Sequence, residues 1–170
     1  MKQLILGGVR SGKTRLAEQH AISTQLPVVY IATAQAHDAE MQARILHHQA
    51  SRPQHWTLLE EPLALAHALR THAAEGQCIL VDCLTLWLTN LLCLQDESCL
   101  QQEINTLIEI LPELPGTIIL VSNETGMGIV PLGELTRRYC DEAGRLHQAI
   151  AAHCNKVILT VAGLPLTLKG

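Results

Sequence analysis

The chain has 170 residues, of which 48% are hydrophobic and 16% are charged, and its formal net charge is −4. This composition excludes a disordered chain, and no apolar run is long enough to cross a bilayer, so we expect one soluble domain spanning residues 1–170. The negative charge and the absence of a Lys/Arg cluster disfavour a nucleic-acid-binding protein, which needs a basic face.

Residues 7–14, Gly-Gly-Val-Arg-Ser-Gly-Lys-Thr, match the phosphate-loop pattern G-x-x-x-x-G-K-[ST] without a mismatch. An apolar run at residues 2–6 precedes the motif and predicts a buried strand, and residues 15–22 have the composition of a helix. Because that run leads directly into the loop, there is no room for a cleavable signal peptide, and we expect a cytoplasmic protein. The alternative, a glycine-rich turn that binds nothing, would need both the motif and its context to be accidental.

In a phosphate loop, successive backbone N–H groups point at the β- and γ-phosphate oxygens of a nucleotide, and the following helix N-terminus adds partial positive charge. Lys13 would neutralise phosphate charge directly, and the Thr14 hydroxyl would bind the accompanying Mg²⁺. The nucleotide ligands predicted in this segment are Gly7, Gly8, Val9, Arg10, Ser11, Gly12, Lys13 and Thr14.

A second buried strand is predicted at residues 28–32. It ends at Thr33, which stands where ligands bind at the carboxyl edge of an open parallel sheet. From the spacing alone, Thr33 could equally be the cap of the next helix.

That next helix is expected at residues 38–49, and it ends in the pair His47-His48. Neighbouring histidines on a helix point about 100° apart, so the pair is not suited to chelate one metal. One imidazole could instead act as a nucleophile or general base, although the residues alone favour two solvated histidines. Arg52, fixed in extended geometry before Pro53, is a cation that could reach phosphate.

A short strand is predicted within residues 55–61, and the run at 79–82 closes on Asp82. A carboxylate at the end of a neighbouring strand is the group that holds the Mg²⁺ of a phosphate loop. Helices are expected at 63–74, 84–94, 100–111 and 137–153, with strands at 117–121 and 156–161 and a short tail. Strands that alternate with helices predict an α/β fold, a mostly parallel sheet of five or more strands with helices on both faces.

Three classes of phosphate-loop protein compete for this pattern. A regulatory GTPase needs an Asn-Lys-x-Asp motif, but Asn155-Lys156 is followed by Val157-Ile158. A motor or strand-exchange ATPase would carry a basic nucleic-acid or partner surface, which the composition does not offer. A small-molecule kinase or nucleotidyltransferase therefore remains.

Five segments resemble, in the same order, the adenosylcobinamide kinase/adenosylcobinamide-phosphate guanylyltransferase family of cobalamin biosynthesis. They are residues 7–14, Tyr-Ile-Ala-Thr at 30–33, the His-His to Arg-Pro segment within 38–53, Asp-Cys-Leu-Thr at 82–85 with Asn-Leu-Leu at 90–92, and Ser-Asn-Glu-Thr-Gly-Met-Gly-Ile-Val-Pro at 122–131. The phosphate loop is generic, whereas the histidine segment and the Asn-Glu-x-Gly-x-Gly-Ile-Val-Pro loop are specific to the family.

The resemblance implies a bifunctional transferase with a RecA-like P-loop nucleoside triphosphate hydrolase fold that forms homotrimers. ATP or GTP would phosphorylate adenosylcobinamide, and a histidine would then attack the α-phosphate of GTP and pass GMP to the corrinoid phosphate, giving adenosylcobinamide-GDP. By motif position the guanylylated residue is His47, with His48 as the alternative. The resemblance also places Ala32, Thr33, Ala34, Ala50, Ser51, Arg52, Pro53 and Glu60 at the nucleotide and Asp82 at the metal or the nucleotide.

Two positions depart from the family pattern. Asp82 stands where some members have Glu, a shorter reach with the same charge, and His147 stands where the pattern predicts Asn. A phosphate-loop switch or another small-molecule kinase, with no guanylyl transfer, is the competing hypothesis.

Overall fold

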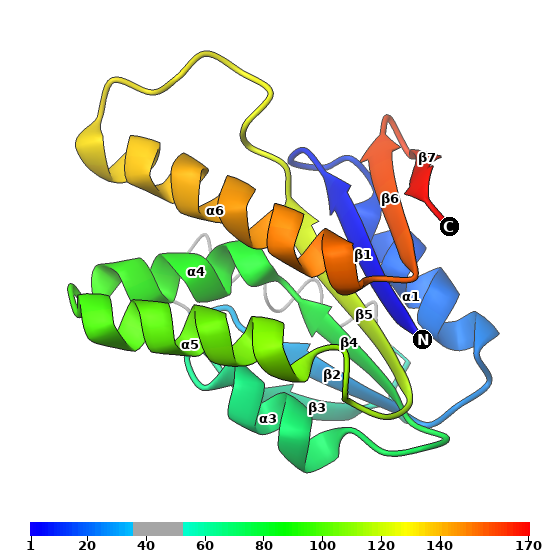
Figure 1. Cartoon of the computed structure of the whole chain (residues 1–170). Coiled ribbons are helices and arrows are strands. Elements are labelled where there is room, and N and C mark those ends of the chain that lie inside the picture. The colour runs from blue at the N-terminus through cyan, green and yellow to red at the C-terminus, as the bar shows by residue number, and fades with distance from the viewer. Residues whose placement is uncertain (36–52) are drawn as a thin grey trace.

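The computed structural model describes residues 1–35 and 53–170. Its centre is a seven-stranded sheet in the order β3-β2-β4-β5-β1-β6-β7, in which all neighbours are parallel except β6 and β7 (Figure 1). The strands are β1 (Lys2–Gly7), β2 (Val28–Ala32), β3 (Thr57–Glu60), β4 (Cys78–Asp82), β5 (Thr117–Asn123), β6 (Lys156–Val161) and β7 (Leu164–Lys169). The predicted mostly parallel α/β sheet is therefore confirmed.

The prediction of a short tail after residue 161 was wrong, because those residues form the antiparallel edge strand β7. Ala162 and Gly163 both have positive φ, 52° and 79°, as the central residues of a tight hairpin turn require. Pro165 makes this strand difficult to predict from the sequence, because proline is disfavoured in sheets and is accepted mainly on an edge strand.

Helices cover both faces of the sheet, as predicted. Helix α1 (Lys13–Ser23) packs on one face. The other face carries α3 (Leu65–His72), α4 (Leu84–Cys93), α5 (Glu97–Ile110) and α6 (Glu134–His153). The predicted helix at 38–49 lies outside the described residues. No helix in the described ranges is long and apolar enough to cross a membrane.

Strand alternation decides which side chains reach which face. On β1, Leu4 and Leu6 join the large core under α3 to α6, whereas Ile5 joins the smaller core under α1. The same alternation places Leu80 of β4 and Val121 of β5 under α1. The last residues of β1, β4 and β5 therefore lie on the α1 side of the sheet at its carboxyl edge.

Candidate nucleotide site

The predicted phosphate loop connects β1 to α1, with Lys13 as the first helical residue. The side chain of Lys13 is buried, and its Nζ donates a hydrogen bond of 3.1 Å to the carbonyl of Gly8. Burial lowers the pKa of Lys13, and the neighbouring Cys83 and Asp82 oppose that shift. The ammonium is thus held inside the loop at the position where phosphate charge would replace its carbonyl contact.

Two glycines of the loop are required by close packing. A Cβ on Gly7 would lie 2.4 Å from Ser11 Oγ and 2.6 Å from the carbonyl oxygen of Thr160. Gly12 has φ of 93°, and a Cβ there would lie 3.2 Å from the Cα of Gly163. The N–H of Gly163 in turn donates to the carbonyl of Ser11 at 2.8 Å. The hairpin turn between β6 and β7 therefore supports the phosphate loop.

Asp82 ends β4, and alternation places it on the α1 side with the loop. Tyr30 Oη donates to Asp82 Oδ2 at 2.5 Å, which fixes the carboxylate from the neighbouring strand. The Tyr30 ring is itself stacked against Trp56, with centroids 6.3 Å apart. The chain thus holds one carboxylate oxygen of Asp82 in a defined direction beside Lys13, whose pKa it influences.

Thr33 is completely buried and bonded to the segment that follows Asp82. Its Oγ1 donates to the carbonyl of Cys83 at 2.7 Å and accepts from the Cys83 N–H at 3.0 Å. Its carbonyl accepts from Asn90 Nδ2 at 2.9 Å. The hydroxyl therefore anchors the turn after β4.

The remaining predicted site residues lie partly within the described ranges and partly outside them. Ala32 pairs with both Glu60 and Asp82 in the sheet register, so these three residues lie side by side at the carboxyl edge. Ala34 lies two residues after the end of β2, and Pro53 lies four residues before the start of β3. The candidate nucleophile His47, its alternative His48, and Ala50, Ser51 and Arg52 lie outside the described residues.

A polar cluster lies on the opposite face, where β5 meets α4 and α6. His147 Nε2 lies 2.8 Å from Ser122 Oγ, and His147 Nδ1 lies 3.8 Å from Glu124 Oε2. Thr85 Oγ1 accepts from the Asn123 N–H at 2.7 Å. Burial lowers the pKa of His147, and Glu124 opposes that shift. Only the tertiary fold brings Thr85 and His147 to the end of β5, since Thr85 lies 37 to 39 positions before residues 122–124 and His147 lies 23 to 25 positions after them.

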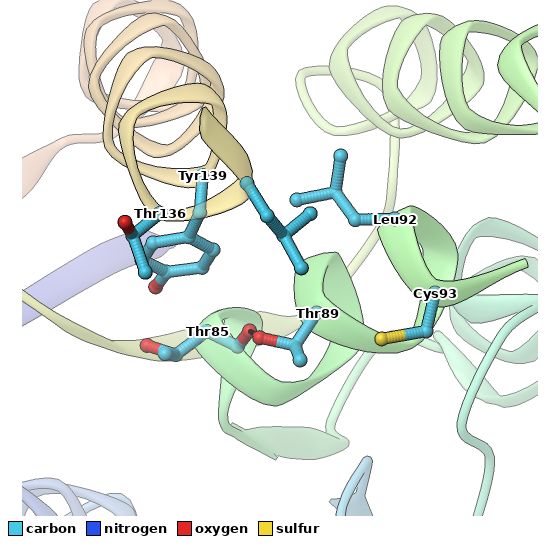
Figure 2. A pocket seen from close by; sticks show the side chains of 7 residues that line it. Thr85, Thr89, Leu92, Cys93, Thr136 and Tyr139 are labelled. Atoms are coloured by element: carbon cyan, nitrogen blue, oxygen red, sulfur yellow. Dashed lines mark hydrogen bonds between the residues drawn. The ribbon is translucent and has the colours of Figure 1, made fainter. Parts of the chain in front are cut away.

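A pocket of about 280 Å³ lies beside this cluster, between α4 and the first turns of α6 (Figure 2). Tyr139 and Thr136 of α6 border it on one side, and α4 supplies the opposite wall. Thr85 connects the pocket to the end of β5 through its bond to Asn123. The lining residues are Thr85, Thr89, Leu92, Cys93, Leu135, Thr136 and Tyr139.

Comparisons with known proteins agree over nearly the whole chain. Residues 3–168 match the family model described as cobinamide kinase / cobinamide phosphate guanyltransferase. The chain is 65% identical over 170 residues to the bifunctional adenosylcobalamin biosynthesis protein CobP of Pseudomonas aeruginosa, a match covering 100% of this chain and 98% of that one. It is 38% identical over 182 residues to the bifunctional adenosylcobalamin biosynthesis protein CobU of Escherichia coli, covering 99% and 100%.

Solved structures of other proteins share the fold. One is an ATPase from a bacterial type III secretion system, with a TM-score of 0.57, 11% identity, and coverage of 98% of this chain and 56% of that chain. Another is the RadB recombinase, with a TM-score of 0.55, 15% identity, and coverage of 93% and 73%. At these identities the likeness shows the P-loop α/β fold alone.

Proposed function

This chain belongs to the cobinamide kinase / cobinamide phosphate guanyltransferase family, and from that premise we propose how its phosphate loop serves both reactions. The protein is a bifunctional transferase of adenosylcobalamin biosynthesis with kinase and guanylyltransferase activities, and it uses ATP or GTP with a corrinoid substrate. The assignment of residues to steps is the proposal. The observation that carries it is the phosphate loop, with its buried Lys13 next to Asp82.

In the kinase reaction, residues 7–14 hold the triphosphate, and the Lys13 ammonium leaves the Gly8 carbonyl to contact phosphate oxygens. The hydroxyl of the corrinoid's aminopropanol arm attacks the γ-phosphorus, and the bond to the β–γ bridging oxygen breaks. The nucleoside diphosphate leaves with that electron pair. Ala32, Ala34, Pro53 and Glu60 border the nucleotide, while Thr33 acts by fixing the segment after Asp82.

The residues present fit a Mg²⁺ ion, because Thr14 and Asp82 offer the oxygen ligands that this ion prefers and Tyr30 fixes the carboxylate. Thr14 and Asp82 would hold the ion together with the nucleotide. When bound, Mg²⁺ would supply charge to offset that of the phosphates.

In the guanylyltransferase reaction, an imidazole nitrogen of His47 attacks the α-phosphorus of GTP, and pyrophosphate leaves as the P–N bond forms. A phosphate oxygen of the corrinoid then attacks the same phosphorus, and the P–N bond breaks to release the histidine. The sequence motif and the family support this role, which splits one difficult displacement into two. Ala50, Ser51 and Arg52 would contact the nucleotide from the same segment.

The test is covalent labelling with GTP that carries a radioactive α-phosphate. The wild-type protein should retain an acid-labile, alkali-stable label, His47→Ala should retain none, and the matched variant His48→Ala should label like wild type. Label on His47→Ala but not on His48→Ala would reverse the assignment. A wild-type protein that takes up no label would favour the competing phosphate-loop switch or simple kinase.

Location, domain organisation and assembly complete the proposal. The protein is a cytoplasmic single-domain enzyme, and it assembles as a homotrimer. Contiguous exposed apolar side chains support an assembly, because monomers rarely leave large apolar patches in water. Met127, Ile129, Val130 and Leu132 are 71% to 97% exposed in the loop before α6, and Leu164, Leu166 and Leu168 are exposed on β7.

A further inference from the structure

Asn123 lies at the carboxyl edge of the sheet, close to the predicted site residues, but it has no role in the proposed function. It ends β5, the strand between β1, which leads into the phosphate loop, and β4, which ends in Asp82. The register pairs Asn123 with Gly7, and it pairs Asp82 with Val121, two residues earlier on β5. Asn123 therefore lies between the loop and the carboxylate and extends beyond the level of Asp82.

The side chain of Asn123 lies on the α1 side of the sheet. Ile119 and Val121 of the same strand belong to the core under α1, and alternation adds Asn123 to that side. The adjacent Ser122 lies on the other side, where its Oγ is 2.8 Å from His147 Nε2. Asn123 thus shares its side and its edge with Lys13 and Asp82, while Ser122 does not.

The side-chain amide of Asn123 has an unused hydrogen-bond acceptor. Its Oδ1 is buried and has no hydrogen-bond partner within residues 1–35 and 53–170, although its backbone N–H is bonded to Thr85. Leaving a buried acceptor unpaired is unfavourable, because the atom has lost water and gained no partner. Ser11 Oγ and Thr160 Oγ1 are also buried without partners, and both belong to segments that pack against Gly7. Unpaired polar atoms therefore gather where the phosphate loop begins.

We propose that Asn123 is a catalytic residue of the kinase reaction and aligns the acceptor hydroxyl with the γ-phosphoryl group. The inference rests on the proposed binding of triphosphate by residues 7–14. In the transition state, Nδ2–H donates to an oxygen of the γ-phosphoryl group in transfer, and Oδ1 accepts from the hydroxyl that attacks. The alcohol oxygen forms the new P–O bond, the bond to the β–γ bridging oxygen breaks, and the alcohol proton passes to an oxygen of the transferred phosphoryl group.

This role separates the two reactions that share the loop. Histidine guanylylation takes place at the α-phosphorus and uses no alcohol, so it has no need of a group that binds the acceptor hydroxyl. An amide also carries no charge and does not ionise, so it can approach phosphate without repulsion. Asn123 should therefore matter for phosphorylation of adenosylcobinamide and not for formation of the guanylyl-protein.

The experiment compares Asn123→Ala with wild type in three assays: phosphorylation of adenosylcobinamide, labelling by α-labelled GTP, and equilibrium binding of GTP. We expect kcat of the kinase reaction to fall about 100-fold, as when one transition-state hydrogen-bond donor is removed. The KM for the nucleotide, the labelling rate and the affinity for GTP should each change less than about threefold, since uniform binding is retained. The melting temperature should not fall, because the variant removes an unpaired buried atom.

Ser122→Ala is the matched control, since it alters the same strand on the opposite face. It should lower the melting temperature through the lost contact with His147 and leave the kinase kcat within about threefold of wild type. Kinase activity of Asn123→Ala within that range overturns the inference, as does a loss of GTP affinity that equals the loss of activity. A Lys13→Ala variant that binds GTP like wild type would instead contradict triphosphate binding by the loop, which is the proposed function itself.

Discussion

At the scale of single residues, His147 makes stability depend on pH. Burial lowers its pKa from the ordinary value near 6.5, with Glu124 acting in the opposite direction. As the pH falls below about 6.5, the unfolded chain therefore binds a proton at this imidazole before the folded chain does. The free energy of unfolding falls with it, and the loss is complete below the folded-state pKa.

His147→Asn should flatten this dependence, because an amide does not titrate. We expect the free energy of unfolding to change with pH less steeply between pH 7 and 5, by at most about 1.4 kcal/mol per pH unit. Urea denaturation at several pH values measures it. Burial, together with Lys156, also lowers the pKa of His20, so part of the slope should remain. Parallel curves for the variant and wild type would show that His147 titrates alike in the folded and unfolded chains.

At the scale of elements, the phosphate loop and the β6–β7 turn behave as one packed unit. Gly12→Ala places a Cβ at positive φ and 3.2 Å from the backbone of Gly163, so neither segment can relax alone. We expect a loss of about 1–2 kcal/mol, or roughly 2–8 °C in melting temperature without nucleotide.

Gly8→Ala is the matched comparison within the same loop. A Cβ on Gly8 meets nothing within 4 Å, and no positive φ is required there. Its melting temperature should stay close to that of wild type. Equal losses in the two variants would contradict the claim that contact with the hairpin turn makes Gly12 necessary.

The strands that could be predicted are those whose sequences are continuous apolar runs, such as Thr117–Asn123 and Cys78–Asp82. The phosphate loop was readable because its residues are contiguous. Strand β7 could not be predicted in this way, because it contains Pro165 and its leucines alternate with other residues and are exposed. Its sequence therefore contains no continuous apolar run. The Tyr30–Asp82 hydrogen bond depends on which strands are neighbours and on their register, which one sequence does not specify. Which of Ser122 and Asn123 lies on the α1 side depends on which helices cover each face of the sheet, and the sequence does not specify that either.

At the scale of the whole molecule, the exposed apolar loop before α6 predicts the state of association. Light scattering coupled to size-exclusion chromatography should give three times the monomer mass for wild type. Replacing Ile129 and Leu132 with Asp should shift the protein to smaller species, because both side chains are 97% exposed in the single chain. Leu94→Asp, an exposed leucine outside both apolar patches, should not change the mass. A wild-type monomer would contradict the proposed trimer.

The position of β1 in the interior of the sheet has a consequence for synthesis on the ribosome. Its two neighbours are β5 and β6, and the Asn155 N–H and side chain bond to the backbone of Lys2 from the far end of the chain. The first strand to leave the ribosome therefore cannot pair on both sides until residues 117–161 have been synthesised. Contacts of such long sequence separation form slowly, so nascent chains that end before β6 should bind no nucleotide.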